Sequence, residues 1–105
     1  MEKRKVVLAD ASEEFRRLLA EAVAKEEDLE IVGSTGDGAA LLELIRDQKP
    51  DVAVMDLILS GMDGLAVLGE LGELRPRVLV LSSFAGSSLA EQAAALGADY
   101  LMLKP

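Results

Sequence analysis

The feature that most constrains the fold is a short apolar run that ends in a single carboxylate. Val52 to Met55 contains no polar residue and is followed directly by Asp56. A run of this length is typical of a strand buried on both faces, as in a parallel sheet covered by helices. Asp56 would then lie at the carboxyl end of the strand, where open α/β sheets bind their ligands. Asp63-Gly64 follows and predicts a helix start with Asp63 as the N-cap.

Strand and helix patterns alternate along the rest of the chain. Strands are predicted over residues 6–9, 29–33, 51–56, 78–81 and 100–103, with the second at a sheet edge because Glu30 interrupts it. Between them we expect a helix capped by Ser12, one that ends before Pro50, one from about Gly64 to Leu74, and one that begins in a Ser88/Glu91 capping box. The first helix presents one apolar face, formed by Phe15, Leu18, Leu19, Ala22 and Val23. This alternation predicts a single α/β domain over residues 1–105, with a doubly wound parallel sheet.

The composition excludes several classes of function. The 105 residues include no cysteine and no histidine, so disulfides, thiolate or imidazole metal sites and Ser-His or Cys-His catalysis are excluded. The net charge of −8 argues against direct nucleic-acid binding by this domain and against binding to an anionic membrane. The chain opens with no signal-peptide pattern, and its apolar runs are far shorter than a membrane span. We therefore expect an acidic domain of the cytoplasm.

Four of the five predicted strands end in a polar side chain, namely Asp10, Asp56, Ser82 and Lys104. The carboxyl ends of parallel strands share one edge, so these residues are expected to converge there. Two carboxylates are suitable ligands for Mg²⁺, while a hydroxyl and an ammonium can bond phosphoryl oxygens. Asp56 could itself act as a nucleophile and form an aspartyl phosphate. Each residue alone has a structural explanation, such as helix capping for Asp10 or a turn for Ser82, and only the joint arrangement indicates a site.

Further residues complete a pattern, since Met62-Asp63-Gly64, Gly97-Ala98 and Lys104-Pro105 accompany these strand ends. With them the whole chain resembles the receiver domain of two-component response regulators. The resemblance implies a flavodoxin-like sheet in strand order 2-1-3-4-5. It also implies phosphotransfer to Asp56 from a sensor histidine kinase or a histidine phosphotransfer protein. Mg²⁺ would be held by Asp10, Asp56 and the backbone carbonyl of Ile58, and Ser82 and Lys104 would contact the phosphoryl group. The segments 62–68 and 103–105 give a closer likeness to the receiver domains of sporulation regulators.

One departure from the family bears directly on the metal. The family usually has two adjacent acids after the first strand, but here Asp10 is followed by Ala11. The missing acid is normally a metal ligand, so Mg²⁺ binding should be weakened, although water could fill the vacancy because Mg²⁺ keeps several waters. Two hypotheses stay open: a working phosphoacceptor with weak metal demand, or a pseudo-receiver that signals without phosphate.

Other departures concern the loops and the fifth strand. Ser60 replaces a usual proline, which should loosen the loop after Asp56. The usual aromatic switch position holds Leu101, and Tyr100 lies on the opposite strand face, half-buried with a wet hydroxyl. Ile58 and Phe84 are apolar at positions that modulate hydrolysis in the family, so self-dephosphorylation should be slow.

The chain stops at Pro105, where receivers normally continue into a fifth helix that covers part of one sheet face. With the final helix absent, the face beneath strands three to five should expose an apolar patch, and we expect self-association. An output domain, for example one that regulates transcription, would lie outside residues 1–105.

Two further classes of function occur on the same fold. An aspartate-nucleophile phosphatase typically carries a second acid two residues beyond the nucleophile, and that position is Ile58. A flavin-binding module would need a phosphate-cradling loop of Gly, Ser and Thr at a strand end, and the sequence offers none of convincing composition. We therefore expect a phosphoacceptor rather than an enzyme.

Overall fold

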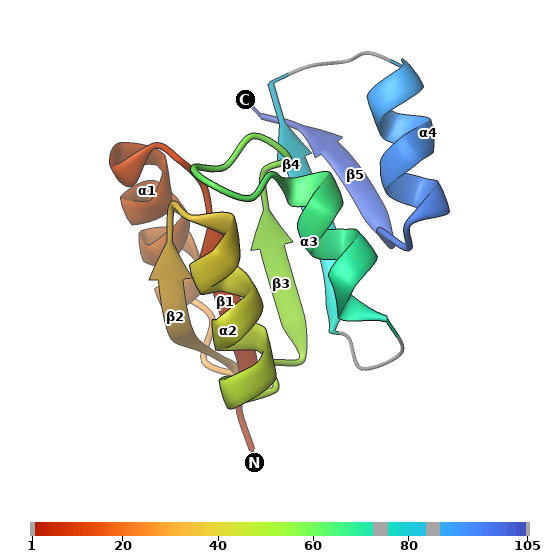
Figure 1. Cartoon of the computed structure of the whole chain (residues 1–105). Helices are drawn as coiled ribbons and strands as arrows, with labels where there is room; N and C mark the ends of the chain where they lie inside the picture. Colours follow the sequence, from red (N-terminus) through yellow and green to blue (C-terminus); the bar gives the residue numbers. More distant parts are fainter. Residues whose placement is uncertain (1, 73–75, 84–86, 105) are drawn as a thin grey trace.

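The structure, a computed structural model, describes residues 2–72, 76–83 and 87–104. Strands and helices alternate without exception along these residues (Figure 1). Their bounds are β1 Arg4–Ala9, α1 Glu13–Ala24, β2 Leu29–Thr35, α2 Gly38–Gln48, β3 Val52–Met55, α3 Gly64–Leu71, β4 Arg77–Ser82, α4 Ser87–Ala95 and β5 Tyr100–Leu103. Each connection from one strand to the next contains one helix, as a parallel sheet requires.

The five strands form one parallel sheet in the order β2-β1-β3-β4-β5. The predicted doubly wound α/β fold and its strand order are therefore confirmed. β2 is an edge strand, as the polar interruption at Glu30 indicated, and β5 forms the other edge. A register shift between Val6 and Val7 marks an irregularity in the β1–β2 pairing. All the strands run in the same direction, so their carboxyl ends lie along the same edge of the sheet.

The core lies on the face of the sheet that α2 and α3 cover (Figure 1). Alternate strand residues point into it because side chains along a strand alternate between faces. The buried apolar residues of this core come from β1, β3 and β4, from the loop after β3, and from the inner sides of α2, α3 and α4: Val7, Ala9, Leu41, Leu42, Ile45, Ala53, Met55, Leu57, Leu59, Val67, Leu68, Leu71, Val78, Val80 and Ala93. Aliphatic residues fill nearly all of this space, as the aromatic content of 3% requires.

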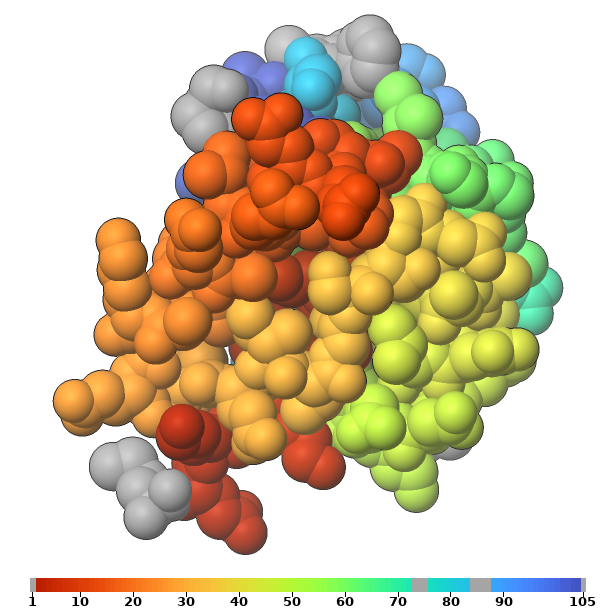
Figure 2. Space-filling view, turned by 90° about the vertical axis from the view of Figure 1, so that its left-hand side faces the viewer, coloured from red at the N-terminus to blue at the C-terminus, as the bar shows by residue number. Residues whose placement is uncertain are grey.

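The opposite face is covered only in part, which corrects two predictions. β3 is fully buried only on the α2–α3 side, through Ala53 and Met55, whereas Val52 and Val54 are half-buried. Similarly, α1 has no buried residue, and Leu18 on its predicted apolar face is 56% exposed. Figure 2 looks onto the β2 edge, where α1 (orange) and α2 (yellow to lime) lie on either side of that strand. α1 therefore covers the β1–β2 part of its face, and no other helix of the described residues covers the part under β4 and β5.

This open part of the sheet matches the predicted apolar patch. On it Leu79 and Leu81 of β4 are half-buried, and Tyr100 and Met102 of β5 are 59% and 56% exposed. Strand pairing places these four side chains on the same face, with Tyr100 beside Leu79 and Met102 beside Leu81. The prediction that Tyr100 is half-buried is wrong, because no described helix packs over its strand on this side.

Local signals set most helix starts as expected. The Ser12 hydroxyl accepts a hydrogen bond from the Phe15 amide at 3.1 Å, and the Asp63 carboxylate accepts one from the Ala66 amide at 2.8 Å. α4 differs, since it begins at Ser87 and Ser88 lies inside its first turn. The Ser88 hydroxyl accepts a hydrogen bond from the Gln92 side chain instead of capping the helix. α3 ends at Leu71, before the predicted end at Leu74, which is outside the described residues.

No helix in the described segments is both long enough and apolar enough to cross a membrane.

Candidate functional site

Three polar residues are buried where β1, β3 and β4 end. Asp10, Asp56 and Ser82 are 2%, 7% and 2% exposed, whereas acids and serines are mostly exposed in folded proteins. The strand pairing brings the acids together, because the Asp56 amide donates to the Ala9 carbonyl at 2.9 Å, one residue before Asp10. Ser82 is the last residue of β4 and reaches the same edge. The predicted convergence is therefore present.

Lys104 follows the edge strand β5 and joins the two acids. Its ammonium nitrogen lies 2.6 Å from Asp10 Oδ2 and 2.7 Å from Asp56 Oδ2. The side chains of Lys104, Asp10 and Asp56 are 15%, 3% and 9% exposed, so this ion triad lies mostly out of water. Burial lowers the pKa of Lys104, but hydrogen bonds to both acids and their negative charges outweigh it, and the pKa is raised above the ordinary 10.5. We name Asp10, Asp56 and Lys104 the acid rim.

Phe15 contributes to the acid rim in a way that the sequence did not indicate. The Lys104 ammonium lies 4.6 Å from the centroid of the Phe15 ring, within cation–π range. Helical periodicity assigned Phe15 to the apolar face of α1 and gave no sign of this contact. The ring and the two carboxylates together hold the ammonium in place.

Backbone amides orient the two carboxylates. Asp10 Oδ1 accepts from the Ser12 amide at 2.9 Å, so Asp10 also shapes the turn into α1, as its structural explanation suggested. Asp56 Oδ1 accepts from the Leu57 amide at 2.7 Å and from the Ile58 amide at 3.3 Å. One oxygen of each acid is thus held by backbone, and the other faces Lys104. At 9% side-chain exposure, Asp56 is mostly buried but not sealed from solvent.

The oxygen ligands of the acid rim are compatible with Mg²⁺, but only two carboxylates are among them. Both Oδ2 atoms already lie against a single cationic atom, which is the arrangement that a shared metal ion would need. Mg²⁺ is commonly bound by one or two carboxylates and keeps its remaining waters. Ala11 is exposed and provides no ligand side chain, and the described part of the chain contains no cluster of three acids that could hold a metal. Asp10 and Asp56 therefore provide the two carboxylates of the rim, and the Ile58 carbonyl stays a predicted third ligand.

The loop after Asp56 is tied down rather than loosened by Ser60, which corrects that prediction. The Ser60 amide donates to the Gly36 carbonyl at 2.9 Å, and the Ser60 carbonyl accepts from the Gly38 amide at 3.0 Å. A proline at this position could not make the first of these bonds, because it has no N–H. Ile58 in the same loop is 52% exposed, as an apolar group beside the acid rim. Phe84 lies outside the described residues.

The fifth strand bears out the expected orientation of its residues. Tyr100 pairs with Leu79 and Leu101 pairs with Val80, so the two side chains point to opposite faces of the sheet. The tyrosine therefore does not occupy the face of the usual aromatic switch. The Lys104 amide donates to the Ser82 carbonyl at 2.9 Å, which fixes the end of β5 against β4 and positions the lysine.

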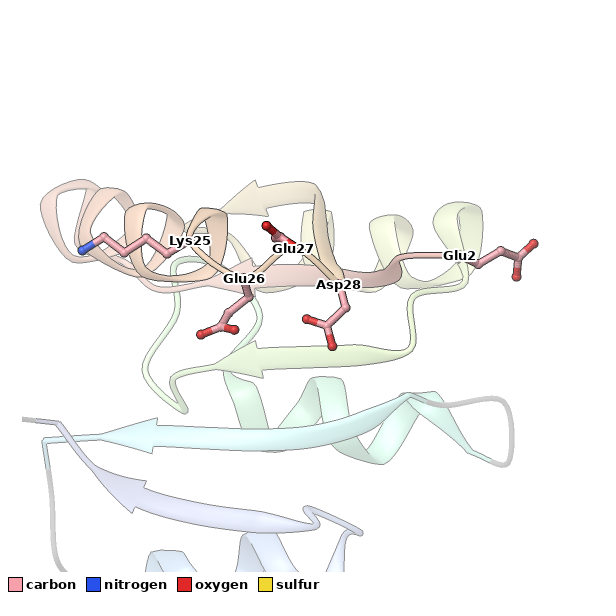
Figure 3. Close-up of a pocket in the computed structure, with 5 residues that line it drawn as sticks. All are labelled: Glu2, Lys25, Glu26, Glu27 and Asp28. Carbon is pink, nitrogen blue, oxygen red and sulfur yellow. The ribbon is translucent and has the colours of Figure 1, made fainter.

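A hollow elsewhere on the surface is not part of this site. It has a volume of about 600 Å³ and is lined by Glu2, Lys25, Glu26, Glu27 and Asp28. Glu2 precedes β1 and Asp28 precedes β2, so this hollow lies at the amino ends of the strands, away from the acid rim. The carboxylates in it point in different directions (Figure 3) and do not converge on a common point.

Comparison with known proteins gives one family and several solved structures of the same fold. A family profile described as the response regulator receiver domain matches residues 6–105. The signal receiver domain of NarL from Mycobacterium tuberculosis is 37% identical with a TM-score of 0.93, over 98% of this chain and 85% of that one. A LuxR-family DNA-binding response regulator from Staphylococcus aureus is 25% identical with a TM-score of 0.90, over 95% and 85% of the two chains. The phosphorylated cyanobacterial phytochrome response regulator RcpA is 26% identical with a TM-score of 0.87, over 98% and 81%. The chain belongs to the receiver domain family of two-component response regulators.

Proposed function

We propose that this receiver domain is a phosphoacceptor whose Asp56 takes a phosphoryl group from the phosphohistidine of a kinase or phosphotransfer protein. The observation that carries the proposal is the position of Lys104, 2.6 and 2.7 Å from the two buried carboxylates at the carboxyl edge of the sheet. A family member 26% identical to this chain has been solved in a phosphorylated state, which supports the same chemistry here.

In the proposed step, a carboxylate oxygen of Asp56 attacks phosphorus and forms an O–P bond while the N–P bond of the phosphohistidine breaks. The electron pair of that bond leaves with the imidazole, which takes up a proton. Lys104 neutralises charge at the site and can bond a phosphoryl oxygen, since an ammonium offers three donors. We propose the Ser82 hydroxyl as a second donor, because it lies at the same edge and is 2% exposed.

Mg²⁺, when bound by Asp10, Asp56 and the Ile58 carbonyl, would neutralise the negative charge on the phosphoryl oxygens. Ala11 leaves this site with two carboxylates, so we propose weak Mg²⁺ binding. In this proposal the negative charge of Asp10 attracts the metal. The positive charge of Lys104 offsets the charge of both acids.

We further propose that the aspartyl phosphate is long-lived and that this domain is not an enzyme. Ile58 is apolar and 52% exposed beside Asp56, so its side chain offers no hydrogen bond to an attacking water. Loss of the phosphoryl group within seconds from an isolated phosphorylated sample would contradict this.

The output is proposed to be a change in association that regulates transcription. Support comes from the DNA-binding LuxR-family relative and from the apolar sheet face around Leu79, Leu81, Tyr100 and Met102, which suits self-association. The DNA-binding part would lie outside residues 1–105. Light scattering that shows only monomer at high concentration would count against self-association through this face. A role in sporulation, indicated by residues 62–68 and 103–105, stays a prediction.

Incubation with acetyl phosphate and Mg²⁺ followed by intact-mass measurement tests the function directly. We expect one phosphoryl adduct on the wild-type chain and none on Asp56→Asn, which keeps the size of the side chain but removes the nucleophile. Asp63→Asn is the matched control, because the Asp63 carboxylate caps α3 and, among the described residues, makes no hydrogen bond or ion pair with the acid rim. An unmodified wild-type chain would refute the proposal.

Ala11 favours one alternative, a pseudo-receiver that signals without phosphate. In that case Lys104 would serve as the permanent counter-ion of the acid rim, and the mass experiment would give no adduct at any Mg²⁺ concentration.

A further inference from the structure

The end of β2 and the turn into α2, residues 35–37, lie between the loop that carries Asp10 and the loop that carries Ile58. On one side the Asp10 amide donates to the Thr35 carbonyl at 3.1 Å. On the other side the Ser60 amide donates to the Gly36 carbonyl at 2.9 Å. The two loops that bear the first and third proposed metal ligands are thus joined through one short segment.

Arg16 strengthens the first of these connections. Its guanidinium donates from Nη1 to the backbone carbonyl of Asp10 at 2.5 Å. The same Nη1 lies only 2.6 Å from where a Cβ on Gly36 would stand, and the Asp10 carbonyl lies 3.2 Å from that point. Arg16 therefore fits against Gly36 because this residue has no side chain.

We propose that Arg16 and Ser60 are positioning residues that act through Gly36 to hold Asp10 and the Ile58 carbonyl at a fixed separation. In a site with three acids, the charge of the carboxylates attracts the metal strongly even when the loops do not hold each ligand at a precise position. Here Ala11 leaves two carboxylates and a carbonyl, so rigid placement of the remaining ligands matters more. The proposal rests on the proposed function in one respect, since it takes Mg²⁺ as the ion that this rim binds.

The bond from Ser60 belongs to its backbone, which permits a matched pair of variants. Ser60→Pro removes the N–H that Gly36 accepts, whereas Ser60→Ala removes the hydroxyl and keeps that N–H. Arg16→Met removes the donor to Asp10 and keeps an apolar stem of similar length. Gly36→Ala places a methyl group against the Arg16 guanidinium and should displace it from the Asp10 carbonyl.

Calorimetric titration of the full chain with Mg²⁺ provides the readout, with urea unfolding in the absence of metal as the measure of purely structural damage. We expect Ser60→Pro, Arg16→Met and Gly36→Ala each to weaken Mg²⁺ affinity roughly threefold to tenfold, the equivalent of one lost hydrogen bond. Ser60→Ala should bind as the wild type does. Because Arg16 and Ser60 act on the same loop, the combined Arg16→Met and Ser60→Pro variant should lose less than the product of the two single effects.

Wild-type Mg²⁺ affinity in Ser60→Pro and Arg16→Met, or fully independent effects in the double variant, would overturn the proposal. So would a wild-type chain that binds no Mg²⁺. Should Ser60→Pro fail to fold, Gly36→Ala and Arg16→Met decide the matter by the same measurement. A chain that forms the acetyl phosphate adduct while these variants keep their affinity contradicts only this inference. A chain that forms no adduct while they lose affinity contradicts only the proposed function.

Discussion

Substitution of Lys104 by methionine tests the energetics of the acid rim most sharply. Asp10 Oδ2 and Asp56 Oδ2 lie 2.6 and 2.7 Å from the same nitrogen, so they are at most about 5.3 Å apart. Without the ammonium, two carboxylates that are 3% and 9% exposed face one another. Two like charges about 5 Å apart repel by roughly 3 kcal/mol at an effective dielectric constant of about 20. We therefore expect Lys104→Met to lower the free energy of unfolding by about 3 kcal/mol.

Urea unfolding followed by circular dichroism gives this number, with and without millimolar Mg²⁺. Magnesium should restore part of the lost stability, because a divalent cation between the carboxylates replaces the missing charge. Addition of Asp10→Asn to Lys104→Met should also restore part of it, since one of the two like charges is then removed.

A surface ion pair of the same chain serves as the control. Arg17 and Glu13 lie 3.7 Å apart on α1 with side chains 67% and 79% exposed, so Arg17→Met should cost no more than about 0.5 kcal/mol. If Lys104→Met is as mild as Arg17→Met, the ammonium does not offset the charge of the two carboxylates, and the reasoning fails.

Three further outcomes are expected. Ala11→Asp should tighten Mg²⁺ binding in a calorimetric titration by restoring a third acid, and an unchanged affinity would show that Ala11 is not the cause of weak binding. Gly69→Ala should raise the free energy of unfolding by up to about 1 kcal/mol, since the added methyl group in α3 would meet nothing within 4 Å. Gly64→Ala should lower the free energy of unfolding, because its Cβ would lie 2.7 Å from the Asp56 carbonyl oxygen. The stability that Lys104 contributes should be complete below pH 10.5, the ordinary lysine value, and disappear as the pH rises through the raised pKa, so that wild-type and Lys104→Met unfolding curves converge only in strong alkali.

The sequence predicted the parts of the fold that depend on local patterns. Apolar runs located all five strands, the interrupted run at Glu30 identified an edge, and the caps at Ser12 and Asp63 were confirmed by their hydrogen bonds. The convergence of Asp10 and Asp56 followed from parallel strand topology alone. These features can be predicted from the spacing of apolar residues along the chain, from capping residues and from the shared direction of the strands.

The features that were wrong or missed depend on contacts between distant segments. Leu18 fits the helical periodicity of α1, yet its exposure is set by how much of the sheet α1 covers. Nothing in the sequence indicates that Phe15 contacts Lys104, or that Arg16 bonds the Asp10 carbonyl in the space beside Gly36. Ser60 was expected to loosen its loop because it replaces a proline, whereas its backbone N–H, which a proline would lack, bonds the Gly36 carbonyl.

The central claim is that Asp56 is the carboxylate that accepts the phosphoryl group. Borohydride reduction of the chain after treatment with acetyl phosphate and Mg²⁺ converts an aspartyl phosphate to homoserine, and peptide mass spectrometry then locates it. We predict a single conversion at residue 56. A conversion at residue 10, or none at all under conditions that saturate the site with Mg²⁺, would contradict the account.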